Sequence, residues 1–177
     1  MISFITNKKG LVTEFFLQNP TREAHLRELA RKTGISFPWV RKLVYGLAKE
    51  GLLLRKKEHG LVLIKANRDN RLFRAFKQSY NLLSLHTSGL VSKLDEEFHR
   101  PQAIVLFGSY SKGEDIETSD IDIAVISNKD YSADLSGFEK KLQRSIKIQV
   151  LPRERIEREF WNTLANGIVL SGYLDVK

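Results

Sequence analysis

Residues 106–126, LFGSYSKGEDIETSDIDIAVI, decide the fold of the second half of the chain. An apolar run over 103–107 leads into Gly108-Ser109, which is typical of a buried strand that ends in a tight turn. Residues 120–126 then alternate between polar and apolar side chains, as a second strand does. Because alternate residues of a strand share a face, the carboxylates of Asp120 and Asp122 are expected to point the same way.

These two carboxylates repel each other unless a cation lies near both. Mg²⁺ prefers oxygen ligands and is usually held by a few carboxylates together with substrate phosphates. In the turn that begins a helix, the free N–H groups of Gly108 and Ser109 and the serine hydroxyl can hold phosphate oxygens, and Lys112 can pair with the same anion. The pattern predicts a site for a nucleoside triphosphate with Mg²⁺ or Mn²⁺. The alternative is an acidic surface loop.

Gly108-Ser109, ten further residues and then Asp120-Ile121-Asp122 resemble the active-site motif of the DNA polymerase β-type nucleotidyltransferase superfamily, in its minimal form. The resemblance covers about residues 90–151. It implies that Gly108 and Ser109 hold the triphosphate, and that Asp120 and Asp122 are catalytic and bind the divalent ions. It further implies transfer of a nucleoside monophosphate from an NTP to an acceptor hydroxyl, with loss of pyrophosphate. Three other acids, Glu114, Asp115 and Glu117, are expected to be solvated loop residues.

One departure from the superfamily concerns its third carboxylate, which comes from a later strand. The strand expected over 146–151 holds Gln149 at that position, and an amide is neither a charged ligand nor a base. The acids that could replace it are Asp130, Asp134, Glu154, Glu157 and Glu159. Two functions stay open: an active nucleotidyltransferase, or a transcriptional regulator whose nucleotidyltransferase-like domain is catalytically impaired and binds nucleotide or a protein partner.

The charge of the chain is concentrated in its first third. Residues 1–67 carry 13 Lys and Arg against 5 Asp and Glu, a balance of +8, whereas residues 68–177 carry 16 of each sign. Such an imbalance favours binding of the first segment to a polyanion.

Helical spacing in this basic segment predicts three helices. The first covers about 10–17, the second follows a cap at Thr21 and ends at Gly34, and the third follows a cap at Ser36. The spacing of Ala30, Gly34 and Val40 resembles the helix-turn-helix of DNA-binding regulators. Two strands, 52–55 and 61–65, around a basic tip over 56–60 complete a pattern that resembles a winged helix-turn-helix.

This resemblance implies that the third helix enters the major groove of double-stranded DNA while the hairpin reaches phosphates. The residues expected at the DNA are Trp39, Arg41, Lys42, Tyr45, Lys56 and Lys57. The alternative is a protein-docking module in which Trp39 belongs to the core.

The expected fold class is α+β. A winged helix-turn-helix occupies 1–67, a helical connector 68–98, and a small mixed α/β nucleotidyltransferase domain 99–177, with its first helix at 90–98. The connector breaks over 86–89, and its apolar stripes suit either core packing or a homodimer. A helix over 154–166, with Trp161 in the core, and a closing strand over 168–174 follow. By resemblance, a small helical toxin-like protein is a possible partner.

Several functional classes are disfavoured by composition. The chain has no cysteine, and its four histidines form no cluster with ligand spacing, so neither disulfides nor a zinc site is expected. No apolar run is long enough to cross a bilayer, and the N-terminus lacks the apolar core of a signal peptide. We therefore expect a cytoplasmic protein with no membrane partner.

Overall fold

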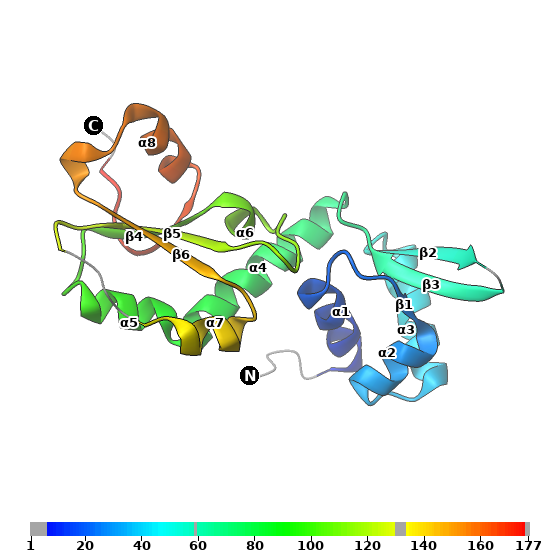
Figure 1. Ribbon diagram of the computed structural model, residues 1–177. Coiled ribbons are helices and arrows are strands. Elements are labelled where there is room, and N and C mark those ends of the chain that lie inside the picture. Colours follow the sequence, from blue (N-terminus) through cyan, green and yellow to red (C-terminus); the bar gives the residue numbers. More distant parts are fainter. Residues whose placement is uncertain (1–6, 59, 130–133, 176–177) are drawn as a thin grey trace. The chain divides into compact units, whose positions relative to one another are not determined.

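The computed structural model describes residues 7–58, 60–129 and 134–175. The chain divides into two compact units, Ile2–Lys77 and Gln78–Lys177 (Figure 1). The border expected from the sequence, between 67 and 68, lies ten residues before this division, which falls inside helix α4, Arg71–Ser88.

Before α4, the described part of the N-terminal unit contains three helices and a small antiparallel sheet. Its elements in chain order are α1 (Lys8–Gln18), β1 (Ala24–His25), α2 (Leu26–Thr33), α3 (Phe37–Lys49), β2 (Leu53–Glu58) and β3 (Leu61–Ala66). The sheet has the order β1-β3-β2. One apolar side of each helix is buried, among others at Val12, Phe16, Leu29, Val44 and Leu47. The three helices predicted from helical spacing are therefore present, and each buries an apolar side.

Gly34 ends α2 with a φ of 68°, so the predicted glycine turn before α3 is confirmed. The predicted cap at Thr21 is wrong. Residues 24 and 25 form the short strand β1 against β3, with Ala24 opposite Ile64, so α2 begins only at Leu26. The hairpin strands are also longer than predicted, and Lys56 and Lys57 lie in β2 rather than in a tip. His59, which we placed in that tip, lies outside the described residues.

The described residues of the C-terminal unit form a four-stranded mixed sheet of order β6-β5-β4-β7, in which β5 and β6 are parallel and the other neighbours antiparallel. After α4 it consists of α5 (Leu90–Glu97), β4 (Ala103–Phe107), α6 (Gly108–Lys112), β5 (Ile121–Ile126), α7 (Ser136–Leu142), β6 (Ile146–Leu151), a 3-10 turn (Arg153–Arg155), α8 (Arg158–Ala165) and β7 (Ile168–Gly172). The predicted strands are present, and the predicted break of the long helix occurs at Gly89.

Helices cover both faces of this sheet, with α5 and α7 on one face and α8 on the other (Figure 1). The first face buries Ile121, Ile123 and Val125 of β5 against residues of α5 such as Leu94. The second face packs Ala124 against Leu164 and the half-buried Trp161, so Trp161 belongs to the core as expected. The distal part of the supposed connector, α5, is therefore core of the C-terminal unit.

The helix predicted over 154–166 is interrupted. Ile156 adopts an extended conformation and is buried in the second core, and α8 begins only at Arg158. Ile156, Phe160 and Leu164 lie four residues apart, so a continuous helix would also place them on one face. The structure instead buries Ile156 from an extended residue between the 3-10 turn and α8. No described helix combines the length and the apolar character that a membrane crossing requires.

Candidate functional site

The two carboxylates lie at the start of β5, beside the end of β4. Phe107, the last residue of β4, is the antiparallel partner of Asp122, and Gly108 follows directly. Gly108 has a φ of 73° and passes very close to Asp122, since a Cβ added to the glycine would lie 2.5 Å from Asp122 Oδ2. The sequence pattern therefore does bring the glycine-serine turn and the second carboxylate together.

Asp122 shares a face of the sheet with Ala124, which packs toward α8, while Ile121 and Ile123 fill the opposite core. Asp120 precedes the first strand residue by one position and is partly exposed, like Asp122. The alternative of a purely solvated acidic loop does not describe Asp122, which belongs to a central strand.

The neighbouring strand β6 supplies a cation to this pair. In the parallel register Asp122 lies opposite Lys147, and Lys147 Nζ is 2.5 Å from Asp120 Oδ2. We expected Gln149 to occupy the position of a third carboxylate, but Gln149 lies opposite Ala124, two residues further along the strand. The residue that stands beside the carboxylate pair is Lys147, so the charge at this position is positive rather than neutral.

Two pKa shifts reflect this arrangement. Partial burial raises the pKa of Asp122, an effect that Lys147 opposes and the nearby Asp120 reinforces. The hydrogen bond and the charge of Asp120 raise the pKa of Lys147. Both effects indicate that Asp122 gains from a cation close to it and that Lys147 stays protonated.

A divalent ion fits this site only in part. Among residues 7–58, 60–129 and 134–175 there is no group of three or more His, Cys, Asp or Glu side chains that could hold a metal. Asp120 and Asp122 alone offer too few ligands for an ion held by protein atoms only, but two carboxylates with substrate phosphates are a usual set for Mg²⁺. The residues present therefore fit one ion that is shared with a triphosphate.

The other sequence candidates lie in different surroundings. Lys112 ends α6 and is exposed, and its pairing with an anion stays a prediction. Asp134 accepts hydrogen bonds from the backbone N and Oγ of Ser136, which lower its pKa. Asp130 lies outside the described residues, and the remaining acids considered as replacements, Glu154, Glu157 and Glu159, are exposed.

Asp115 was expected in solvent but is 1% exposed. Its Oδ1 accepts a hydrogen bond from Asn81 Nδ2 at 2.6 Å, and the same nitrogen donates to the carbonyl oxygen of Tyr110 at 2.9 Å. Arg144 lies 3.8 Å from the other carboxylate oxygen. This buried network ties α4 to the segment that follows the glycine-serine turn. Nothing in the sequence pattern distinguished Asp115 from its acidic neighbours.

A second candidate surface is the outer side of α3. Trp39 is 47% exposed, as expected for the outer side of this helix, so the alternative that placed it in the core is wrong. The ammonium groups of Lys8 and Lys42 lie 5.3 and 5.1 Å from its ring centre. The ring of Tyr45 is flanked in the same way by guanidinium groups, from Arg41 at 5.6 Å and Arg55 at 4.1 Å. Each aromatic ring thus carries two cations within cation–π distance.

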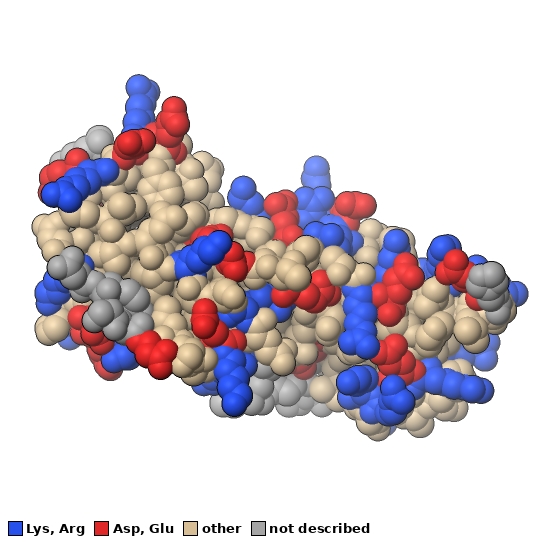
Figure 2. Space-filling view, in the orientation of Figure 1, with Lys and Arg blue, Asp and Glu red and all other residues tan. Residues whose placement is uncertain are grey.

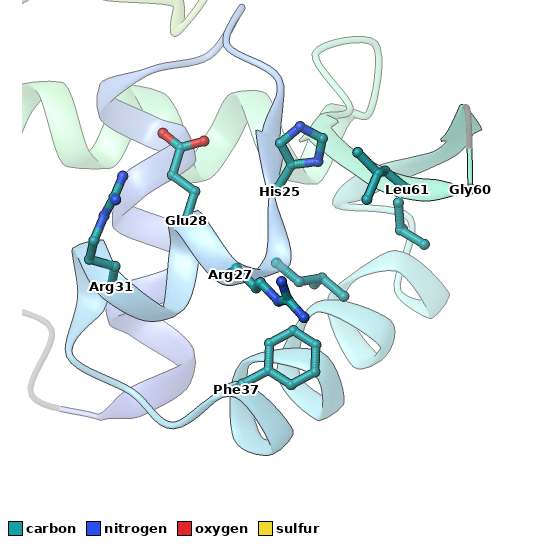
Figure 3. Close-up of a pocket in the computed structure, with 9 residues that line it drawn as sticks. His25, Arg27, Glu28, Arg31, Phe37, Gly60 and Leu61 are labelled. Carbon is teal, nitrogen blue, oxygen red and sulfur yellow. The ribbon is translucent and has the colours of Figure 1, made fainter.

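Lys56 and Lys57 extend this basic surface along β2, where both are exposed. Figure 2 shows Lys and Arg side chains gathered over the region of α2 and α3. A pocket of about 630 Å³ opens between α2, the start of α3 and the hairpin, and Arg27 points toward the ring of Phe37 in it (Figure 3). It is lined by His25, Leu26, Arg27, Glu28, Arg31, Phe37, Gly60, Leu61 and Val62.

Comparison with known proteins gives one family match. Residues 88–172 match the family model described as "Nucleotidyltransferase domain". This range includes the glycine-serine turn, the carboxylate pair and Lys147. Among solved structures, Sso10a-2, a DNA-binding protein from Sulfolobus solfataricus, is similar at a TM-score of 0.36 and 16% identity, over 51% of this chain and 95% of that chain. A similarity this low carries no argument. No curated protein matched.

Proposed function

From the match of residues 88–172 to the nucleotidyltransferase domain, we propose that the C-terminal unit transfers a nucleoside monophosphate from an NTP to an acceptor hydroxyl. The observation that carries the proposal is the close approach of Gly108 to Asp122. The bare glycine backbone lets the triphosphate lie against the turn, immediately beside the carboxylate that would share its ion.

Each residue has a role in this scheme. The backbone of Gly108 and the hydroxyl of Ser109 hold phosphate oxygens, and Lys112 adds a positive charge. Asp120 and Asp122 hold Mg²⁺ or Mn²⁺ together with the nucleotide. When bound, the ion neutralises charge on the phosphoryl oxygens during transfer.

The N-terminal unit, in this proposal, is a winged helix-turn-helix that binds double-stranded DNA. Its element order of helix, strand, two helices and hairpin supports the proposal, as do the cation-flanked rings of Trp39 and Tyr45 on the exposed side of α3. Arg41 and Lys42 would contact DNA from this helix, and Lys56 and Lys57 would contact phosphates from the hairpin.

A second candidate function follows from Lys147. A lysine beside Asp122 supplies neither a third carboxylate nor, while protonated, a general base, and loss of a general base typically removes about 10²- to 10⁴-fold in rate. The protein would then be a DNA-binding regulator whose C-terminal unit binds nucleotide or a protein partner without efficient transfer.

Labelling distinguishes the two functions. The full chain is incubated with α-labelled NTPs, Mn²⁺ or Mg²⁺ and candidate acceptors, including itself. Transfer predicts a labelled product that is lost in Asp120→Asn with Asp122→Asn and kept in Asp69→Asn, an exposed aspartate of the N-terminal unit. If no acceptor is labelled while metal-dependent NTP binding is intact, transfer is wrong and the regulator is supported.

A further inference from the structure

The carboxylate pair already has a cation from its own chain. Lys147 projects from β6, the neighbour of Asp122 in the sheet, and its Nζ is 2.5 Å from Asp120 Oδ2. No other described ion pair involves Asp120 or Asp122. A divalent ion that approaches the pair therefore meets an ammonium group at the oxygen it must bind.

This ammonium group is held loosely. The Lys147 side chain is 64% exposed and that of Asp120 is 32% exposed, so water reaches both. Exposed ion pairs contribute little to stability, because solvent screens the attraction and the long lysine side chain loses freedom in the pair. The ammonium group can turn away without disturbing the sheet.

We propose that Lys147 is a built-in counter-ion that weakens the binding of a free divalent ion to the carboxylate pair, so that the pair takes up the ion mainly together with a nucleoside triphosphate. Without nucleotide, Lys147 reduces the charge of the pair from −2 to −1, which disfavours a free dication. With nucleotide, the phosphates supply additional negative charge for both the ion and the displaced ammonium group. The inference rests on one part of the proposed function, namely that Asp120 and Asp122 bind the divalent ion.

The test is a titration of the full chain with Mn²⁺ without nucleotide, followed by calorimetry or electron paramagnetic resonance. Lys147→Met should bind Mn²⁺ about 5- to 10-fold more tightly than the unmodified chain, since a nearby like charge is removed from a partly exposed site. Lys147→Glu, which adds a third carboxylate, should bind more tightly still. Lys147→Arg keeps the charge and should stay within about twofold of the unmodified chain.

Two controls define the site. Lys140→Met removes the same charge from an exposed position on α7 and should leave the affinity unchanged. Adding Asp120→Asn to Lys147→Met should abolish the gain, because the ion would then lose its ligand. The proposal is overturned if Lys147→Met binds Mn²⁺ no more tightly than the unmodified chain, or if Lys140→Met gains as much.

The same titrations in the presence of nucleotide test whether the triphosphate removes the effect of Lys147. A non-hydrolysable NTP should bring the Mn²⁺ affinities of the unmodified chain and Lys147→Met together, and an undiminished difference would contradict the proposal. Failure of the transfer function is measured separately. In that case neither the unmodified chain nor Lys147→Met would label an acceptor, whereas their Mn²⁺ affinities would still differ.

Discussion

The backbone conformation and surroundings of Gly108 restrict which residue can occupy this position. Its positive φ suits glycine, and any side chain there would meet the carboxylate of Asp122. Gly108→Ala should lower the free energy of unfolding by about 1–3 kcal/mol from backbone strain alone. It should also abolish NTP binding, because the Cβ occupies the space against the turn. Chemical denaturation and fluorescence titration with an NTP analogue measure the two effects.

Gly137 provides the matched control. It lies in the first turn of α7, and a Cβ added there meets nothing within 4 Å. Gly137→Ala should leave NTP binding unchanged and the stability equal or raised by up to about 1 kcal/mol, because alanine is the better helix former. Equal NTP binding by the two alanine variants would remove Gly108 from the site.

For individual residues, the sequence predicted the positions of the glycine-serine turn and the two carboxylates, but not which side chains lie next to them. Alternation along a strand determines which side chains share a face, so Asp122 could be placed from its neighbours. The register between β5 and β6 depends on the packing of separate elements. For that reason Lys147 could not be distinguished from Gln149, nor the buried Asp115 from a solvated acid.

Among the elements, α4 makes a buried contact with the residues that follow the glycine-serine turn. Asn81 donates to both the Tyr110 carbonyl oxygen and the Asp115 carboxylate, and it is 1% exposed. Asn81→Ala leaves two buried acceptors without this donor and should lower the free energy of unfolding by about 1–3 kcal/mol. Thermal and urea denaturation measure the loss. Ser92→Ala, at an exposed position of α5, should change stability by no more than about 0.5 kcal/mol.

Helix α3 makes a separate prediction. The guanidinium groups of Arg41 and Arg55 lie 5.6 and 4.1 Å from the centre of the Tyr45 ring, so we expect the ring to help hold both on the exposed surface. Tyr45→Ala should weaken binding to duplex DNA by about 5- to 30-fold, which corresponds to about 1–2 kcal/mol for a partly desolvated cation–π pair. Tyr173→Ala, at a 69% exposed position in the C-terminal unit, should leave the DNA affinity unchanged in the same gel-shift assay.

Elements with strong periodicity were predicted well and those set by distant partners were not. The continuous apolar run of β4 and the alternation of β5 give boundaries within one residue of those expected. In contrast, β1 has only two residues and exists because β3 pairs with it. The interruption before α8 was likewise not visible in the sequence, because Ile156, Phe160 and Leu164 have the spacing of one continuous helix face.

For the whole molecule, the concentration of positive charge in the first third of the chain predicts that the DNA affinity falls with salt concentration. The excess of +8 lies entirely in residues 1–67. Each phosphate contact contributes about −0.9 to the slope of the logarithm of DNA affinity against the logarithm of salt concentration. Lys56→Ala with Lys57→Ala should therefore make the slope less negative by about 1.8, whereas Lys129→Ala with Lys140→Ala should leave it unchanged. A slope near zero in the unmodified chain would contradict DNA binding.

The position of β6 at the margin of its sheet has a consequence for how Lys147 can be replaced. Within the described residues β6 pairs with β5 alone, so its other side offers main-chain groups to any extended segment that approaches. Charged side chains are a common defence of such margins against self-association. Replacing Lys147 by methionine gives the sequence Ile-Met-Ile-Gln-Val, which has lost its only charge. Pairing between the β6 edges of different Lys147→Met molecules should therefore increase with protein concentration. Light scattering of Lys147→Met, compared with Lys147→Arg, would reveal it.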